Sequence, residues 1–298
     1  MNRRLFLLGA ALSLAACTST TQPPVAVQPA LPVVKPVAKP RIGLALGGGA
    51  AKGFAHIGVI KALEAQGIVP DVVTGTSAGS VVAALYASGM NGFALQERSF
   101  SLDQAELRDL AFGGGGLVKG EKLQDFVNKL VGNRPFEKLN RPFAAVATEL
   151  DTGRRVAFSR GNVGQAVRAS CSIPGVFQPV VISGKRYVDG GVVSPVPVDA
   201  ARELGADIVI AVDISAKAQY GRQAEGIPAI LNQTVIIMGQ KLGEQELSRA
   251  DVVVRPRVGQ IGAADFDLKH TAVLEGERAL QAALPQIRDK IARWQPNR

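Results

Sequence analysis

Apolar and polar positions alternate along the chain in blocks that predict strands and helices in turn. Residues 42–46 and 69–74 are short apolar runs of strand length. Each is followed by a segment with apolar residues at helical spacing, residues 50–66 and 78–87. Glycines end these segments, as expected at turns and at the ends of helices. The pattern therefore predicts two successive strand, turn and helix units.

The same alternation continues to the end of the chain. Further strands are expected at residues 142–149, 155–158, 186–188, 206–214 and 252–255, and further helices at 93–109, 119–130, 227–248 and 271–294. The near-continuous apolar run at 206–214 is typical of a central parallel strand. We expect an α/β domain over residues 41–298, with a central, mostly parallel sheet covered by helices on both faces.

A serine lies at the second of the predicted strand-to-helix turns, in the sequence Gly75-Thr76-Ser77-Ala78-Gly79. A serine at such a turn projects its hydroxyl from the edge of the sheet, and the two glycines leave room for the backbones to pass. The amino terminus of the following helix favours negative charge that develops there. This pattern predicts a nucleophile elbow.

Three consecutive glycines, Gly47, Gly48 and Gly49, follow the first predicted strand. A dinucleotide fingerprint would need glycine where Lys52 stands, and a Walker loop would need the sequence Gly-Lys-Ser/Thr, but Gly53 is followed by Phe54. Backbone amides at a helix amino terminus can instead form an oxyanion hole. The alternative is a tight turn that only serves packing.

These motifs together resemble the bacterial branch of the patatin-like phospholipase family. The resemblance rests on residues 47–53 (GGGAAKG), residues 75–79, residues 169–177 (ASCSIPGVF) and Asp189-Gly190-Gly191, and it covers about residues 41–200. It implies a serine acyl hydrolase with a Ser77–Asp189 dyad in place of a triad, acting on membrane lipids without a cofactor. It also implies that Lys52 occupies the position where the family carries Arg or Lys.

Within this hypothesis Asp189 accepts the proton of Ser77 as the hydroxyl attacks an ester carbonyl, and an acyl-serine then reacts with water. A free aspartate, with a pKa of about 3.9, is a weak base at neutral pH. We therefore expect burial to raise the pKa of Asp189. Lys52 is expected to stabilise charge or orient the loop, or else to be an exposed helix lysine. His56 is expected to pack its helix against the sheet.

Two alternatives remain open. Ser77, Asp189 and His270 occur in the chain order of an α/β-hydrolase triad, which predicts a role for His270 as the base. The chain is also compatible with a lipoprotein that binds lipid or a partner through a vestigial site, without turnover.

Residues 1–16 are expected to be a lipoprotein signal peptide, because two arginines precede a short apolar run. The sequence before Cys17 resembles a lipobox and implies a lipidated Cys17 that anchors the protein. The residue after Cys17 is Thr18 rather than aspartate, which resembles the sorting signal of lipoproteins sent to the outer membrane. We expect an exported bacterial lipoprotein at the outer membrane, facing the periplasm, by either the Sec or the twin-arginine route. Residues 17–40 are rich in proline and predict an extended tether.

Composition changes this picture little. The net charge of +9 suits an anionic membrane surface, or only solubility. No motif indicates nucleic-acid binding or identifies a protein partner. A zinc site is not expected from two histidines without a metal-binding spacing. If Cys17 is acylated, Cys171 is the remaining thiol and no internal disulfide can form.

Residues 93–131 contain four consecutive glycines, residues 113–116, between two predicted helices. One interpretation is a mobile lid over an acyl-chain groove. The candidate lining consists of the larger apolar residues of this stretch: Phe100, Leu107, Leu110, Phe112, Leu117 and Val118. The other interpretation is ordinary core.

Overall fold

The computed structural model describes residues 39–103, 105–107, 109, 119–217 and 226–296. The predicted signal peptide, Cys17 and most of the predicted tether lie outside the described residues.

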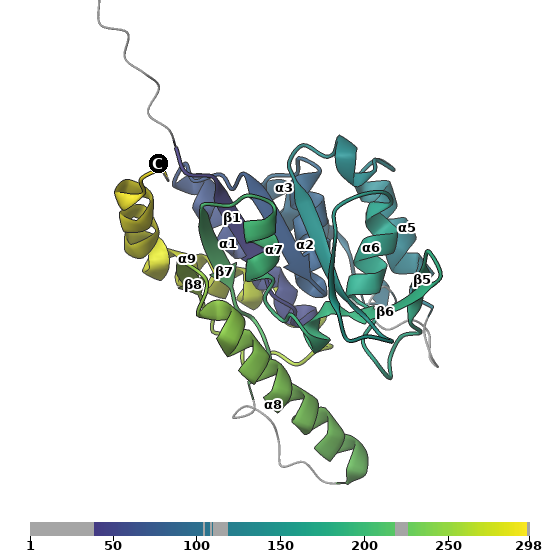
Figure 1. The fold of residues 1–298 in the computed structure, drawn as a ribbon. Helices are drawn as coiled ribbons and strands as arrows, with labels where there is room; N and C mark the ends of the chain where they lie inside the picture. The colour runs from purple at the N-terminus through teal and green to yellow at the C-terminus, as the bar shows by residue number, and fades with distance from the viewer. Residues whose placement is uncertain (1–38, 104, 108, 110–118, 218–225, 297–298) are drawn as a thin grey trace, which may run out of the picture. The chain divides into compact units, whose positions relative to one another are not determined.

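The strands of the described chain form one sheet (Figure 1). They are β1 (Ile42–Leu46), β2 (Val72–Thr76), β3 (Phe143–Glu149), β4 (Arg155–Phe158), β5 (Val180–Ile182), β6 (Lys185–Asp189), β7 (Ile208–Val212) and β8 (Val252–Val254). Their order is β5-β6-β3-β2-β1-β7-β8, with β4 paired to β3 beside this row. The pairs from β3 through β2, β1 and β7 to β8 are parallel, whereas β4, β5 and β6 run antiparallel to their neighbours. The predicted, mostly parallel sheet is confirmed.

Helices surround this sheet. They are α1 (Phe54–Ala65), α2 (Ala78–Ala87), α3 (Gly92–Ser101), α5 (Glu121–Leu130), α6 (Val163–Ser170), α7 (Val198–Glu203), α8 (Ile227–Leu247) and α9 (Lys269–Arg293), with short 3-10 turns at Ala50–Gly53 (η1), Phe136–Lys138 (η2), Gly190–Val192 (η3) and Phe266–Leu268 (η5).

Side chains that alternate along β1 show that both faces of the sheet are covered. Leu44 and Leu46 belong to a core that includes residues of α1, α2 and α9. Ala45, between them, belongs to a second core with Val198 of α7 and Leu247 of α8. Successive strand residues point to opposite faces, so the helices divide between the two sides as predicted.

The elements differ from the prediction in several places, two of which are helices. Helix α6 was not predicted, because its eight residues are too few to display a helical period. It is held locally by Asn162, whose side chain accepts a hydrogen bond of 2.7 Å from the Gln165 amide. The predicted helix at 93–109 ends at Ser101. None of the described helices combines the length and apolar character needed to cross a membrane.

Helices α1 and α9 cross in direct backbone contact, and two glycines make this possible. A Cβ atom at Gly58 of α1 would collide with the Val273 carbonyl oxygen of α9. A Cβ atom at Gly276 of α9 would collide with the Ala55 carbonyl oxygen of α1.

We therefore expect Gly58→Ala to lower the free energy of unfolding by about 3 kcal/mol, since overpacking against a rigid backbone cannot be relieved by a rotamer change. Gly239→Ala is the matched control in α8, because a Cβ atom at Gly239 would meet no described atom within 4 Å. The control should raise stability by up to about 1 kcal/mol. Urea melts of both variants measure the difference, and equal midpoints would contradict the close crossing.

Candidate active site

Ser77 lies at a sharp turn between β2 and α2. Its backbone angles are φ 52° and ψ −126°, a conformation that is strained for any residue with a side chain. A Cβ atom at Gly75 would collide with the Gly79 backbone, and one at Gly79 would collide with the Leu46 carbonyl oxygen. The glycine on each side of the serine is therefore a steric requirement of this turn.

The pairing of β3 brings Ser77 and Asp189 together. Residues 145–146 of β3 pair with both β2 and β4, so these two strands lie on opposite edges of β3. Residues 147–148 pair with both β4 and β6, so β6 lies on the same edge as β2. Thr76 of β2 pairs with Val146 of β3, and Asp189 of β6 pairs with the next β3 residue, Ala147. Strand residues rise by about 3.3 Å, so the end of β6 meets the end of β2 directly beside Ser77.

Asp189 is buried, and its carboxylate is only partly satisfied. One oxygen, Oδ1, accepts a hydrogen bond of 2.7 Å from the Gly191 amide. The other, Oδ2, has no hydrogen bond of standard geometry within the described residues. Burial raises the pKa of Asp189 to about 6, against the lowering effect of the nearby Ser77 hydroxyl and the Gly191 amide. The predicted rise of this pKa is confirmed.

Ser170, at the end of α6, holds the turn in place. Its hydroxyl accepts a hydrogen bond of 2.9 Å from the Ser77 amide and donates one of 2.6 Å to the Val146 carbonyl of β3. Ser170 lies in the stretch that carried the family resemblance, but no local signal indicated this role.

The glycine loop also contacts the elbow. A Cβ atom at Gly48 would lie 3.2 Å from the Ser77 Cβ. The Gly47 amide donates to the Val212 carbonyl and the Gly48 amide to the Pro195 carbonyl, each at 3.0 Å. Gly49 is the loop glycine whose amide donates no hydrogen bond within the described residues. The predicted oxyanion hole stays a prediction, and this pattern makes Gly49 its best donor.

Neither histidine contacts the Ser77 and Asp189 side chains. His56 is fully buried, and its Nε2 lies 2.8 Å from the Gly47 carbonyl oxygen. Burial lowers the pKa of His56 to about 4, so the neutral ring donates Nε2–H to that carbonyl at pH 7. His270 is exposed at the start of α9, and its ring centroid lies 4.0 Å from that of Phe100. The triad interpretation therefore gains no support from this arrangement.

Lys52 is buried, which rules out the exposed-lysine interpretation. Burial lowers its pKa, and so does the charge of Lys217, while Asp213 raises it. Asp213 follows β7 and forms ion pairs with Lys217 at 2.7 Å and with Arg255 at 3.7 Å. Burial would raise the pKa of Asp213, but Lys217 and the hydrogen bonds from Ser215 keep it below its usual value. Among the described residues no group of His, Cys, Asp or Glu side chains could hold a metal ion.

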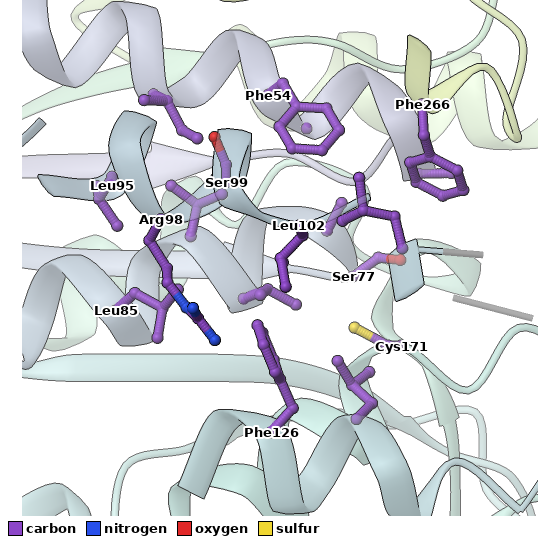
Figure 2. A pocket seen from close by; sticks show the side chains of 18 of the residues that line it. Phe54, Ser77, Leu85, Leu95, Arg98, Ser99, Leu102, Phe126, Cys171 and Phe266 are labelled. Atoms are coloured by element: carbon purple, nitrogen blue, oxygen red, sulfur yellow. The ribbon is translucent and has the colours of Figure 1, made fainter. Parts of the chain in front are cut away.

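A cavity of about 180 Å³ adjoins Ser77. Figure 2 shows Ser77 and Cys171 at one end of it and Leu85, Leu95 and Arg98 at the other. Most of the lining is apolar: Ala50, Phe54, Ile57, Val81, Val82, Leu102, Leu107, Leu123, Phe126, Ile173, Phe177 and Phe266. An apolar cavity of this kind beside a hydroxyl can hold a hydrocarbon chain.

Part of the predicted lid region lines this cavity. Leu107 does so, whereas the ring of Phe100 lies against His270 instead. The other candidates, Leu110, Phe112, Leu117 and Val118, lie outside the described residues. Motion of this region stays a prediction.

The family model described as patatin-like phospholipase matches residues 44–202, more than half of the chain. The chain belongs to the patatin-like phospholipase family. An uncharacterized NTE family protein of Mycobacterium tuberculosis is 38% identical over 200 residues, covering 66% of this chain and 56% of that protein. Lysophospholipase NTE1 of Coccidioides immitis is 36% identical over 203 residues, covering 64% of this chain and 13% of that protein.

This patatin-like chain therefore spans about half the length of the mycobacterial relative and a smaller share of the fungal one. Among solved structures, VipD from Legionella pneumophila matches with a TM-score of 0.50 at 14% identity, covering 84% of this chain and 67% of that chain. This likeness supports the fold alone.

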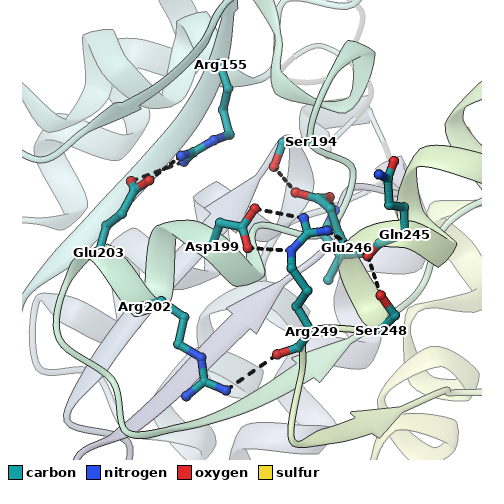
Figure 3. A network of polar contacts seen from close by, with 10 residues as sticks. Arg155, Ser194, Asp199, Arg202, Glu203, Gln245, Glu246, Ser248 and Arg249 are labelled. Atoms are coloured by element: carbon teal, nitrogen blue, oxygen red, sulfur yellow. Dashed lines mark hydrogen bonds and ion pairs between the residues drawn. The ribbon is translucent and has the colours of Figure 1, made fainter.

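A buried carboxylate on α8 supports the end of β2, next to Ser77, through the segment that contains Ser194. Glu246 accepts a hydrogen bond of 2.5 Å from the Ser194 hydroxyl (Figure 3). It also accepts one of 2.9 Å from the Val196 amide. The Ser194 carbonyl in turn accepts a hydrogen bond of 2.8 Å from the Thr76 hydroxyl, one residue before Ser77. Sequence reasoning missed this support, because nothing near Glu246 in the chain distinguishes it from Glu244, the other glutamate of α8.

Glu246 should make stability depend on pH. Burial raises its pKa from 4.5 to about 7, despite the hydrogen bonds from Ser194 and Val196. The folded state thus binds the proton more tightly than the unfolded state. The stability that this group contributes is fully present below pH 4.5 and is lost as the pH rises through 7.

We expect Glu246→Gln to remove this dependence, because glutamine keeps a donor and an acceptor but no charge. Relative to the variant, the parent should lose about 2 kcal/mol of unfolding free energy between pH 5 and pH 8. Urea melts at both pH values measure it, with the exposed Glu244→Gln as a matched control that should follow the parent. A parent-to-variant gap that is the same at both pH values would contradict the buried, titrating carboxyl.

Proposed function

We propose that this chain is a lipid acyl hydrolase that uses a Ser77–Asp189 dyad and an acyl-serine intermediate. The observation that carries the proposal is the shared edge of β3, where the ends of β2 and β6 bring the two side chains together in a buried position. Membership of the patatin-like phospholipase family supports hydrolysis of lipid esters.

In the proposed mechanism the Ser77 hydroxyl attacks the carbonyl carbon of the ester, and its proton passes to Asp189. The Gly49 amide donates to the resulting oxyanion, and positive charge at the buried Lys52 adds to its stabilisation. When the ester bond breaks, Asp189 returns the proton to the leaving alcohol. Water then attacks the acyl-serine while Asp189 takes a proton from it. When the bond between the acyl carbon and the Ser77 oxygen breaks, Asp189 passes this proton to that oxygen, so the acid is released and both side chains return to their starting states.

The cavity beside Ser77 supports a lipid substrate. Its apolar lining fits an acyl chain whose ester carbon lies at the serine. One relative is named a lysophospholipase, which favours phospholipids or lysophospholipids among the candidates. Simple acyl esters and thioesters would undergo the same chemistry.

We propose further that the hydrolase acts at a membrane, as an exported lipoprotein anchored through Cys17 to the outer membrane and facing the periplasm. The support is the sequence around Cys17, with its short apolar run and its proline-rich continuation to residue 40. Such a tether would keep the domain within reach of its substrates.

Ser77→Ala and Asp189→Asn should each lower ester hydrolysis by at least about a hundredfold, because each removes one partner of the proton transfer. A fluorophosphonate probe should label the parent chain and not Ser77→Ala.

For the parent, kcat/KM should rise with pH and level off above about pH 6, the pKa of Asp189, because the base acts in its ionised form.

Asp151→Asn is the matched control, since Asp151 forms only an exposed ion pair with Arg186, and it should retain full activity. A parent chain that neither hydrolyses a panel of lipid esters nor reacts with the probe would refute the proposal. That result would favour the lipid-binding or partner-binding lipoprotein instead.

His270→Ala should keep hydrolysis within about twofold of the parent, because its ring packs on Phe100 and does not contact Asp189. Steady-state hydrolysis of a short-chain ester measures this. A loss of about a thousandfold, the size expected for removing a general base, would favour the Ser-Asp-His triad over the dyad.

A further inference from the structure

The first part of α8 is unusually apolar for an exposed helix. No charged residue occurs between Ile227 and Gln240. Six large apolar side chains of this stretch are 46% to 75% exposed, and they are half of all the large apolar side chains found exposed among the described residues. They are Ile227, Ile230, Leu231, Val235, Ile237 and Met238, which we call the α8 apolar face.

These side chains share one side of the helix. At 100° per residue they fall within an arc of about 160°, which is the width of an amphipathic stripe. Ile236, on the opposite side, is half-buried. The carboxyl-terminal half of α8 packs against the rest of the domain. Leu247 lies in the core beneath the sheet, and Glu246 accepts hydrogen bonds from Ser194 and Val196. A stripe that would normally face a core thus has no described residues covering it.

The position of α8 relates this face to the candidate active site. Helix α8 packs against η3, which directly follows Asp189. Figure 1 shows its amino-terminal half extending beyond the sheet, on the side where β6 ends. The α8 apolar face therefore projects beyond the sheet from a helix whose carboxyl-terminal half is anchored beside the candidate active site.

We propose that the α8 apolar face docks this chain onto the surface of a lipid bilayer. The choice of a bilayer rests on the proposed function, since a hydrolase of membrane lipids must present its catalytic edge to them. Charged residues oppose entry into the apolar layer, and this stretch has none. The helix would lie in the interface, because no described helix is long and apolar enough to cross a membrane.

A second copy of the chain fits the face less well. The six side chains expose on the order of 600 Å², at the upper limit of what monomeric proteins leave uncovered. A stable dimer usually buries about 800 Å² on each partner. The exposed stripe alone falls short of that, whereas a bilayer has no minimum contact area and accepts an irregular apolar surface.

Vesicle binding by the full chain tests the proposal. Every preparation carries Cys17→Ser, so that no attached lipid contributes. The test variant is Leu231→Gln with Val235→Gln, and the matched control is Val69→Gln with Leu274→Gln, which replaces exposed apolar residues far from α8 in the sequence. Co-sedimentation with vesicles of phosphatidylcholine, and with vesicles of phosphatidylcholine and phosphatidylglycerol in a 3:1 ratio, measures the partition coefficient. Thermal melts check folding.

The test variant should bind both kinds of vesicle at least about tenfold more weakly than the parent, and the control should bind like the parent. Equal binding by the test variant and the control would overturn the proposal. So would a parent that is dimeric without lipid and a test variant that is monomeric, measured by light scattering, because a second copy would then cover the face.

The failure of this proposal and that of the proposed function are distinguishable. Ser77→Ala should lose hydrolysis and keep vesicle binding. A chain that binds vesicles through α8 but hydrolyses no ester would refute only the proposed function. An active chain whose vesicle binding is independent of α8 would refute only the docking surface.

Discussion

One edge of β3, shared by β2 and β6, is the constraint on which the candidate site depends. β2 must end at Thr76 for β6 to take over the same edge, and the turn at Ser77 is the way the chain leaves it. Gly190 is required because a Cβ atom there would collide with the Val146 carbonyl of β3. The strained φ of 52° at Ser77 is thus held by pairing on both sides of the junction.

A second layer of contacts keeps that junction rigid. Residues 194–197 accept hydrogen bonds from Thr74, Thr76 and the Gly48 amide, so the elbow strand and the glycine loop share one support. Glu246 fixes the support from α8, and Arg249, two residues after the end of α8, pairs with Asp199 of α7 through two hydrogen bonds of 2.7 Å. A movement of α8 would therefore shift Thr76, the residue before Ser77.

Sequence reasoning could predict what local chemistry marks. The strand-turn-helix pattern and its glycines located Ser77, and alternating elements predicted the sheet and its two covered faces. Asp189 was indicated by family resemblance, because an Asp-Gly-Gly alone is an ordinary turn. Ser170 and Glu246 could not be predicted, since each bonds to a partner 93 or 52 residues away. The same holds for the Gly47 and Gly48 amides, whose acceptors lie on other strands and loops.

The chemistry of the pair follows from burial rather than from a histidine. Raising the pKa of Asp189 from 3.8 to about 6 strengthens it as a base by about two powers of ten. Burying that charge costs about 3 kcal/mol of folding free energy, by the same shift. The cost is tolerable because the Gly191 amide and the Ser77 hydroxyl both favour the ionised form. A fully exposed aspartate would avoid the cost and would be too weak a base, while a deeply buried one without these donors would stay protonated at neutral pH. The junction of β2 and β6 holds Asp189 between these limits.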